Sequence, residues 1–325
     1  FRLTVMLNAI KAYEAAQGEY ETIGHEFAIY ELFYRLQIGL TIFDEVHRSL
    51  HQVYKVVSYL HAGMVLGLSA TMISMDRDVQ RMQHLLFAKT LRFDDIQMKK
   101  YIRSYSVWYQ IENIHSSGIR TSNRGMSTYS QSAFEESILS RPSLLIQYLD
   151  LIAHCVKYMF YDENPDYQKG DRAAIYAYTK EMCEKIKLRL IDHYPDLDIR
   201  RYVAEDPYEN IIDPDVRVTT VGSGGTAVDI PRLTFVFLTC ALNSPSSNLQ
   251  VLGRLRHIEG KVMKFAALTC LDIPRQVKYD RDRVVLIQEK VMSHENLRYP
   301  KVLVATPKPH KNPYFAQRQQ PHYYA

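Results

Sequence analysis

The sequence predicts an α/β fold with parallel sheets, divided between two domains. Two short apolar runs, at 38–43 and 65–68, each end abruptly in polar residues, and a segment with helical spacing connects them. A second block, from residue 173 onward, repeats the alternation of apolar runs and helical segments. Strand, helix and strand in this order are typical of parallel sheets. The length of 325 residues leaves room for two such domains.

The first domain is expected to cover residues 1–98. Its stretch 1–34 has apolar residues at helical spacing, and the two apolar runs that follow have the length of buried parallel strands. A helix is predicted over 48–60, between the two runs. From 72 to 101 the chain is polar with a helical pattern, so we place the domain boundary near the end of this segment.

The second domain is expected to cover residues 99–275. A loop rich in Ser, Gly, Thr and Asn precedes helices over 134–160, which are interrupted at Pro142. Residues 276–325 are predicted to form a C-terminal extension with a poorly ordered tail. The expected strands lie at 173–178, 199–203, 216–220, 234–238 and 262–269, and the expected helices at 180–193 and 248–257.

The composition is that of an ordinary globular protein, with 46% apolar and 23% charged residues. A formal net charge of +4 is mildly basic, which permits a nucleic-acid partner without requiring one. The four cysteines lie far apart and none forms C-x-x-C, so neither a zinc site nor a disulfide framework is indicated. A reduced, cytoplasmic setting is therefore expected. No apolar run approaches the roughly 20 residues of a membrane helix, so we expect no membrane association.

Two carboxylates, Asp44 and Glu45, follow the first apolar run, and His47 stands two residues further on. The carboxyl end of a buried strand is where open α/β sheets bind ligands. In a nucleotide hydrolase, one carboxylate at this place holds Mg²⁺ and the next polarises the attacking water. Ser69 and Thr71 end the next run, and adjacent parallel strands would place both motifs at one edge of a sheet. Taken alone, either motif could be an ordinary polar turn.

Two further motifs lie in the second domain. The segment 219–229 follows an expected strand, and Gly222, Gly224 and Gly225 would let the backbone approach a phosphate closely. A glycine-rich hairpin or linker is the alternative interpretation. The segment 250–256, at the start of an expected helix, carries two arginines suited to stabilising the charge that develops in phosphoryl transfer. Its alternative is a solvated basic helix face.

In this order the motifs resemble those of the superfamily 2 helicases and translocases of the DExH type. The resemblance covers residues 1–270, and within the superfamily it is nearest to helicases of DNA viruses and bacteriophages. It implies two RecA-like domains, the first incomplete at its N-terminus, and ATP-dependent movement along nucleic acid. The matching segments are 44–47 for motif II, 69–71 for motif III, 174–179 for motif IV, 219–229 for motif V and 250–256 for motif VI.

The resemblance also implies a role for each motif residue in the first domain. Asp44 would coordinate Mg²⁺, and Glu45 would act as the general base. His47 would sense the γ-phosphate of ATP. Ser69 and Thr71 would couple hydrolysis to movement of the strand.

In the second domain, the resemblance gives Gln250 the role of a second γ-phosphate sensor and Arg254 that of an arginine finger. The remaining residues belong to motif V. Thr219, Thr220, Gly224 and Thr226 would contact the nucleic-acid backbone, and Gly225 and Asp229 would lie next to the nucleotide.

Two departures from the family pattern bear on this interpretation. Motif VI normally ends G-R-x-x-R, which would place its second arginine at His257, whereas here that arginine is Arg256. Either Arg256 substitutes through a local shift, or Arg254 acts alone. No phosphate-binding loop of the form G-x-x-x-x-G-K-[ST] occurs in the sequence. We therefore expect a chain truncated upstream of Phe1 that is inactive alone, with a degenerate, non-hydrolysing relative as the alternative.

The predicted function is that of a helicase or translocase that uses ATP and Mg²⁺ and acts on nucleic acid, DNA rather than RNA. For a viral protein, the cytoplasm would be that of the host cell. The alternatives are a non-catalytic nucleic-acid-binding module that keeps the motor scaffold, and the motor subunit of a restriction or repair complex.

Two other features are less specific. The aromatic stripe at 101–109 could stack on bases, although such stripes more often belong to a core. The charged segment 280–283 is expected to be a solvated helix face.

Overall fold

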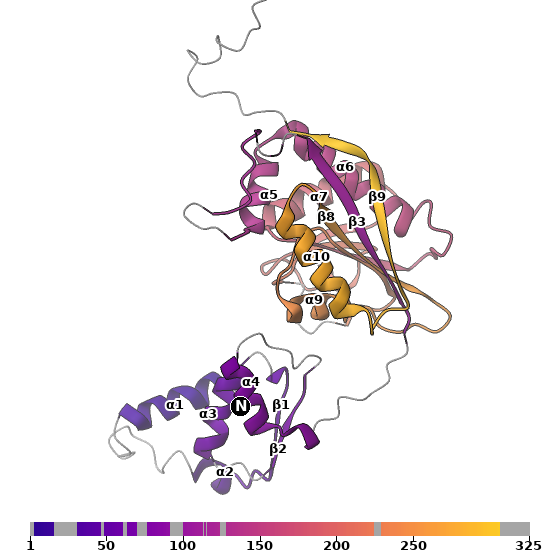
Figure 1. The fold of residues 1–325 in the computed structure, drawn as a ribbon. Coiled ribbons are helices and arrows are strands. Elements are labelled where there is room, and N and C mark those ends of the chain that lie inside the picture. Colours follow the sequence, from indigo (N-terminus) through magenta and orange to yellow (C-terminus); the bar gives the residue numbers. More distant parts are fainter. Residues whose placement is uncertain are drawn as a thin grey trace, which may run out of the picture. The chain divides into compact units, whose positions relative to one another are not determined.

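The structure is a computed structural model. It describes residues 3–15, 31–46, 49–60, 64–69, 77–91, 100–112, 114, 116–123, 128–223 and 229–305. The chain divides into two compact units, Phe1–Gln97 and Met98–Ala325, one residue from the boundary expected from the sequence (Figure 1). Both units contain parallel sheets with helices, which confirms the predicted α/β class.

The first unit contains a two-stranded parallel sheet with helices packed on one face. The strands pair in register, and Phe43 contacts both small hydrophobic clusters that the helices form. One cluster is centred on Ile10 and Val56, and the other on Val46, Leu50 and Val53. The elements are α1 (Leu3–Ala15), α2 (Leu32–Arg35), β1 (Leu40–Phe43), α3 (Leu50–Leu60), β2 (Met64–Gly67), α4 (Arg77–Leu86) and the 3₁₀ helix η4 (Lys89–Leu91).

The opposite face of this sheet is apolar and exposed. Because side chains alternate along a strand, Leu40 and Ile42 of β1 lie on the same face as Met64 and Leu66 of β2. Their exposed fractions are 48%, 54%, 64% and 43%. Parallel sheets normally bury both faces. The first unit therefore presents a row of apolar side chains to solvent.

The second unit contains a seven-stranded sheet with the order β5-β6-β4-β7-β8-β3-β9, in which every pairing is parallel. The central strands β4, β7 and β8 are mostly apolar, as expected for strands buried on both faces. The strands are β3 (Ile102–Glu112), β4 (Arg172–Ala177), β5 (Ile199–Tyr202), β6 (Val216–Thr220), β7 (Leu233–Leu238), β8 (Met263–Cys270) and β9 (Ser293–Val304).

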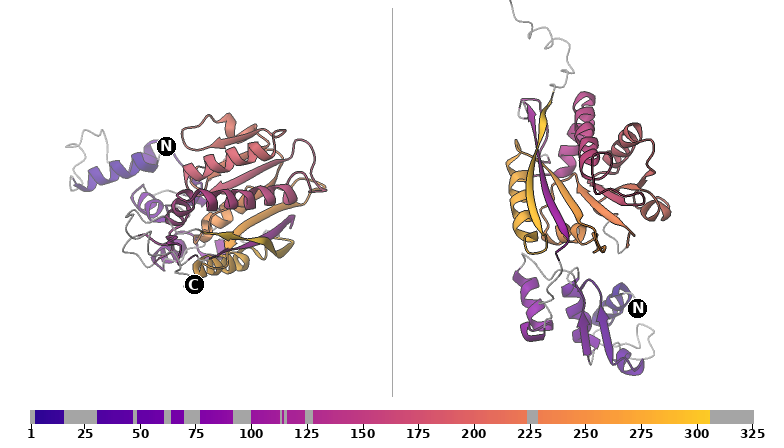
Figure 2. Two further views of the ribbon diagram at one scale, coloured as in Figure 1. Left: turned by 90° about the horizontal axis from the view of Figure 1, so that it is seen from above. Right: turned by 90° about the vertical axis from the view of Figure 1, so that its right-hand side faces the viewer.

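Helices cover both faces of this sheet (Figure 2). On one face α5 (Gln131–Leu139), α6 (Pro142–Met159) and α7 (Lys180–His193) bury the larger core, which includes Phe235 and Phe237. On the other face α8 (Glu209–Ile212), α9 (Pro245–Leu252) and α10 (Pro274–Ile287) bury a second core around Val236 and Phe265. The carboxyl ends of the central strands are consequently held between two layers of helices.

The sequence analysis did not predict β3 and β9. Ser104 and Ser106 interrupt the apolar pattern of β3, and they are buried because their hydroxyls bond to His294 (3.1 Å) and Asp280 (2.6 Å). β9 is an edge strand that contains Pro300 and several charged residues, which is common at edges. Residues 276–304, expected to belong to the C-terminal extension, form most of α10 and all of β9. Residues 306–325 lie outside the described ones.

The prediction that 280–283 form a solvated helix face is wrong for two of these residues. Asp280 and Arg283 are only 4% and 3% exposed. Asp280 pairs with Arg283 and accepts hydrogen bonds from Ser106 and from the indole of Trp108 (3.2 Å). Burial lowers the pKa of the Arg283 guanidinium, and the Asp280 carboxylate opposes this shift. Because Ser106 and Trp108 of β3 donate hydrogen bonds to the Asp280 carboxylate, this part of α10 faces inward.

Candidate functional site

In the first unit the two sequence motifs lie at one edge of the two-stranded sheet. Asp44 and Glu45 follow β1, and Ser69 follows β2. Two backbone hydrogen bonds tie the strand ends together: Leu68 N donates to Phe43 O (2.8 Å) and Val46 N donates to Leu68 O (3.1 Å). His47 and Thr71 lie outside the described residues.

The turn after β1 has a strained backbone at Glu45. Its φ is 50°, in the left-handed region that residues other than glycine rarely adopt. Asp44 Oδ1 accepts the N–H of Glu45 (2.9 Å), which stabilises the turn. Asp44 is exposed and Glu45 is half-buried, so the two carboxylates have different surroundings. Asp44 offers the oxygen ligands that Mg²⁺ prefers, although the described residues contain no group of three or more metal-binding side chains.

In the second unit, a pocket of about 750 Å³ opens at the carboxyl edge of the seven-stranded sheet. It is formed where β4, β6 and β7 end and where α5 and α9 begin. We refer to it as the carboxyl-edge pocket. It is lined by Asn123, Thr128, Tyr129, Ser130, Gln131, Ser132, Tyr178, Thr220, Val221, Gly222, Ala241, Leu242, Asn243, Ser244, Ser247 and Tyr279.

Three helices begin at or beside this pocket, each with a capped N-terminus. Ser130 Oγ caps α5, Ser244 Oγ caps α9, and Thr179, next to the lining residue Tyr178, caps α7. N-terminal N–H groups and the helix dipole both favour anions. The described residues that line the pocket include hydroxyls and amides but no charged side chain. The pocket can therefore attract an anion through fixed neutral donors.

Motif V contributes to this pocket in part. Thr220 and Gly222 line it, whereas Thr219 is buried, with 1% of its surface exposed. Thr220 Oγ1 accepts the N–H of Ser223 (3.2 Å), which closes the turn after β6. Asp229 is exposed. Gly224, Gly225 and Thr226 lie outside the described residues.

Motif VI lies at the end of a helix, not at its start. Gln250 belongs to the last turn of α9, and the helix ends at Leu252 with Gly253 as its C-cap. A Cβ at Gly253 would approach Leu249 O to 3.0 Å, which explains the glycine. The predicted helix over 248–257 is therefore too long, and both arginines follow the helix.

The two arginines differ in their surroundings. Arg254 is half-buried and Arg256 is exposed. Burial raises the pKa of the Tyr176 hydroxyl, and the positive charge of Arg254 opposes this shift. Between the arginines, Leu255 O accepts a hydrogen bond from the Tyr101 hydroxyl (3.0 Å). This contact fixes the segment beside the start of β3.

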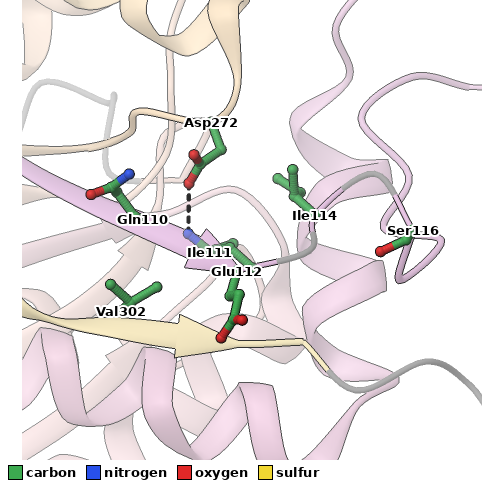
Figure 3. A pocket seen from close by; sticks show the side chains of 7 residues that line it. All are labelled: Gln110, Ile111, Glu112, Ile114, Ser116, Asp272 and Val302. Carbon is green, nitrogen blue, oxygen red and sulfur yellow. Dashed lines mark hydrogen bonds between the residues drawn. The ribbon is translucent and has the colours of Figure 1, made fainter.

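A second pocket, of about 510 Å³, lies where β3 ends, beside β9 (Figure 3). Its lining includes the carboxylates of Glu112 and Asp272, and Asp272 Oδ2 accepts the N–H of Ile111 (2.7 Å). These two carboxylates would repel a phosphate. The carboxyl-edge pocket is therefore the better site for an anionic ligand.

Sequence reasoning found Thr220 and Gly222 but missed most of the lining. The missed signal is the pair of helix starts at Ser130 and Ser244, each an N-cap residue. Pro245 at the first position of α9 strengthens the second of these signals. The sequence cannot show that the two helix starts lie at one pocket.

No protein-family model matches the chain, and no curated protein matches it. Among solved structures, S. cerevisiae Dbp5 bound to RNA and ADP BeF3 is similar, with 12% identity, a TM-score of 0.50, and coverage of 84% of this chain and 63% of that chain. The structure of T4 UvsW has 16% identity and a TM-score of 0.43, over 86% of this chain and 57% of that chain. The Mycobacterium smegmatis helicase Lhr bound to ssDNA and AMP-PNP has 16% identity and a TM-score of 0.44, over 80% of this chain and 32% of that chain.

The likeness to Dbp5 shows the fold, which is the α/β arrangement of two-domain RecA-like proteins. The chain spans less than two thirds of the Dbp5 chain. Within the described residues, no helix has the length and apolar character needed to cross a membrane.

Proposed function

We propose that this chain is the nucleic-acid-binding part of an ATP-dependent helicase or translocase of the DExH type, acting on DNA rather than RNA. The carboxyl-edge pocket carries the proposal, because capped helix N-termini and neutral hydroxyls meet there. Such donors suit the sugar–phosphate backbone of a single strand, which proteins bind without reading sequence. The preference for DNA rests on the motif resemblance.

Two exposed side chains of the lining extend what the pocket can contact. Asn243 is exposed and offers an amide for sugar or base edges. Tyr178 is 48% exposed and presents a ring on which a base can stack. The pocket thus combines fixed donors for phosphate with a neutral platform for the rest of the nucleotide.

The residues for ATP and Mg²⁺ are only partly present. Asp44 would hold Mg²⁺, which would neutralise phosphate charge, while Glu45 would orient water and Arg254 would contact the transferred phosphate. The 325 residues contain no phosphate-binding loop, so they do not fit a complete nucleotide site. We therefore assign nucleic-acid binding, and not ATP hydrolysis at a motor-like rate, to this chain alone.

The missing loop also supports a second candidate, a non-catalytic nucleic-acid-binding module with the motor scaffold. The coding sequence upstream of Phe1 distinguishes the two, because a phosphate-binding loop encoded there would favour the motor. In either case, addition of oligonucleotide to this chain should leave steady-state ATPase activity at background. Robust stimulated turnover would contradict both assignments.

The proposal is tested by fluorescence anisotropy with labelled oligo(dT) and oligo(U), using the full chain. Asn243→Asp places a negative charge in the pocket and should weaken binding by roughly tenfold. Asn296→Asp on β9 makes the same change at an exposed residue outside the pocket and should leave the affinity unchanged. Absence of binding, or equal effects of the two variants, would overturn the proposal, and tighter binding of oligo(U) would overturn the preference for DNA.

A further inference from the structure

Glu135 on α5 is a fully buried carboxylate, 0% exposed, directly behind the carboxyl-edge pocket. Within the described part of the chain, no ion pair joins it to a cation. Instead it accepts hydrogen bonds from fixed donors around the end of β4. Oε1 accepts from Gln131 Nε2 (3.1 Å) and Tyr178 N (3.0 Å), and Oε2 accepts from Thr179 N (2.8 Å) and Thr179 Oγ1 (2.8 Å).

Gln131, one helical turn earlier, continues this polar chain across the sheet. Its Oε1 accepts from Ala241 N (3.0 Å), after β7, and from the Tyr129 hydroxyl (2.6 Å). Gln276 Nε2 donates to the same hydroxyl (2.6 Å), and its Oε1 accepts from Cys270 N (2.8 Å) at the end of β8. One buried chain therefore joins the carboxyl ends of three adjacent strands.

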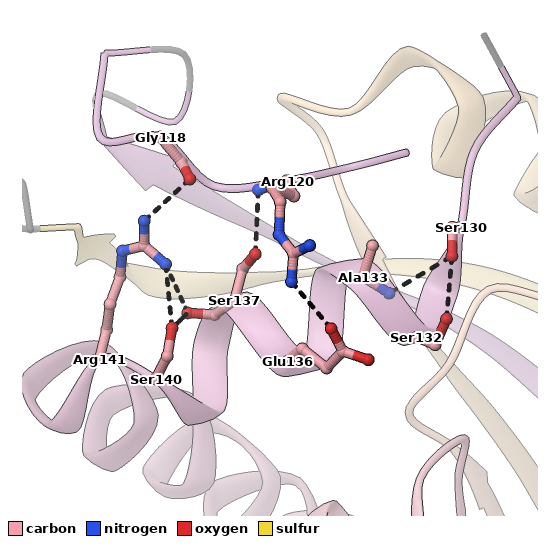
Figure 4. A network of polar contacts seen from close by, with 9 residues as sticks. All are labelled: Gly118, Arg120, Ser130, Ser132, Ala133, Glu136, Ser137, Ser140 and Arg141. Carbon is pink, nitrogen blue, oxygen red and sulfur yellow. Dashed lines mark hydrogen bonds and ion pairs between the residues drawn. The ribbon is translucent and has the colours of Figure 1, made fainter. Parts of the chain in front are cut away.

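The helix that carries Glu135 is fixed at both ends (Figure 4). Ser130 caps its start. At its other end, Arg141 Nη1 donates to Ser137 O (2.7 Å) and Arg141 Nη2 donates to Gly118 O (2.9 Å). Because α5 is held in this way, the Glu135 carboxylate has a fixed place relative to the strand ends.

The ionised carboxylate is costly where it lies. Burial raises the pKa of Glu135, and the hydrogen bonds from Thr179, Tyr178 and Gln131 only oppose this shift. A glutamine could not replace it without loss, because its amide NH₂ would face N–H donors. The site is thus built for a carboxylate at a cost in stability, which calls for a role beyond folding.

We propose that Glu135 is a positioning residue that sets the affinity of the carboxyl-edge pocket for single-stranded nucleic acid. It holds the backbone of Tyr178 and Thr179 directly, and it holds Ala241 through Gln131. Tyr178 and Ala241 both line the pocket, each after one of the paired strands β4 and β7. A rim fixed before binding loses less freedom when a strand docks. This inference rests on the proposed function of the pocket.

The test compares Glu135→Gln with Glu136→Gln in the full chain. Both variants remove one carboxylate from α5, but Glu136 lies outside the pocket and faces solvent. We expect Glu135→Gln to raise the dissociation constant for oligo(dT) by roughly tenfold, the effect of losing a charge-assisted hydrogen bond. Glu136→Gln should leave it unchanged.

The affinity for oligo(dT) should also be measured from pH 5 to pH 8. Thymine bases do not titrate over this range, so they do not disturb the measurement. Wild-type affinity should fall as the pH falls through the raised pKa of Glu135, because a protonated carboxyl loses an acceptor for N–H. Glu135→Gln should remove this dependence. The titratable groups that face Glu135 are Cys183, Cys240, Tyr109, Tyr129 and Tyr148. Burial raises the pKa of each, so they stay neutral over this range.

Thermal stability separates positioning from a purely structural role. Because the folded state binds the Glu135 proton more tightly than the unfolded state, wild-type stability relative to Glu135→Gln should rise as the pH falls toward the ordinary value of 4.5. Affinity should change in the opposite direction. A structural role alone would make Tm and affinity fall together. If Glu135→Gln does not fold, Glu135→Asp, which is too short to reach all four donors, should show the same loss of affinity at pH 8, where its carboxyl is ionised.

The outcomes distinguish this inference from the proposed function. If wild type binds oligo(dT) and Asn243→Asp weakens binding, but folded Glu135→Gln binds like wild type at every pH, the inference is overturned and the proposed function stands. If wild type does not bind oligo(dT), or Asn243→Asp has no effect, both are overturned. A loss of affinity in Glu135→Gln that is greatest at pH 8, where the variant is most stable relative to wild type, supports the positioning role.

Discussion

The two units use the same building block, a parallel strand followed by a helix, with different degrees of support. In the second unit seven strands lie between helices on both faces, and the central side chains of both faces are buried. In the first unit two strands have helices on one face, and Leu40, Ile42, Met64 and Leu66 are exposed on the other. A short parallel pair with one bare face is marginal in water. A second layer of helices, more than strand sequence, therefore decides how firmly a strand end is held.

The same contrast applies to the candidate sites. The turn with Asp44 and Glu45 is tied to its neighbour by two backbone hydrogen bonds, at Val46 and Leu68. The carboxyl-edge pocket is instead tied by capped helices and the buried chain around Glu135. The second unit thus supports a binding role by itself.

The largest expected difference is in amide hydrogen exchange. Amides of β4 and β7 should exchange at least about a thousandfold more slowly than amides of β1 and β2, because the former open only with the whole core. Exchange measured by mass spectrometry on the full chain resolves both sheets. Equal protection of the two sheets would break the comparison.

Core substitutions should repeat the contrast at single residues. Phe235→Ala, at a 0% exposed position, should destabilise the second unit by about 3–5 kcal/mol, whereas Ile42→Ala should change stability by less than about 0.5 kcal/mol. Urea unfolding followed through Trp108, the single tryptophan, which lies on β3, reports the second unit, and hydrogen exchange of β1 and β2 in Ile42→Ala reports the first. A large loss in Ile42→Ala would show that the exposed face is covered in solution.

Substitution of a buried arginine should have a smaller effect of opposite sign, which is a gain in stability. Arg217 on β6 is 0% exposed. Its Nη2 donates to Pro214 O (2.6 Å), while its Nε and Nη1 have no hydrogen-bond partner among the described residues. Removing this uncompensated charge by Arg217→Met should stabilise the second unit by about 1–3 kcal/mol at pH 7. Urea unfolding through Trp108 measures it, and destabilisation would contradict it.

The difference in stability between Arg217→Met and wild type should depend on pH with a definite sign. Burial lowers the pKa of Arg217 to about 9, and Arg172 contributes in the same direction. Above that pH, the unfolded state binds more protons than the folded state, so wild-type stability rises with pH relative to the variant. The advantage of Arg217→Met should therefore shrink between pH 9 and pH 10. A constant difference would mean that the guanidinium stays charged.

The smallest expected effect is a shallow salt dependence of oligo(dT) binding. In the part of the chain that the structure describes, no cationic residue lines the pocket. Each lysine or arginine contact to a single strand adds about 0.7 to the slope of log affinity against log salt. We expect a slope smaller in magnitude than about 2. A steeper slope would place binding on a basic surface elsewhere.

Much of the fold follows from sequence periodicity. The helix over 180–193 and the strand over 216–220 have the predicted bounds. Thr179 caps the start of the helix, and four of the five residues of the strand are buried. The prediction fails at β3, where Ser104 and Ser106 are buried by partners from α10 and β9 that lie about 170–190 residues later in the chain. Local patterns carry no information about such partners.

The site was predictable to a lesser degree. Motifs at strand ends identified Thr220 and the carboxylates after β1 correctly as neighbours of a sheet edge. The helix end at Gly253 was missed, because helical spacing continues past it while the cap depends on a close approach to Leu249 O. Glu135 was missed as well, since its donors come from the β4–α7 loop and from Gln131, and nothing in the local sequence marks a buried carboxylate.

The most direct test of the central claim is the hydrogen-exchange footprint of oligo(dT) on the full chain. The account predicts added protection in peptides that contain Tyr178, Thr220 and Ala241–Ser247, with no change along β9 or in the second pocket at Glu112 and Asp272. Protection centred on β9, or binding with no change around Tyr178 and Thr220, would contradict it.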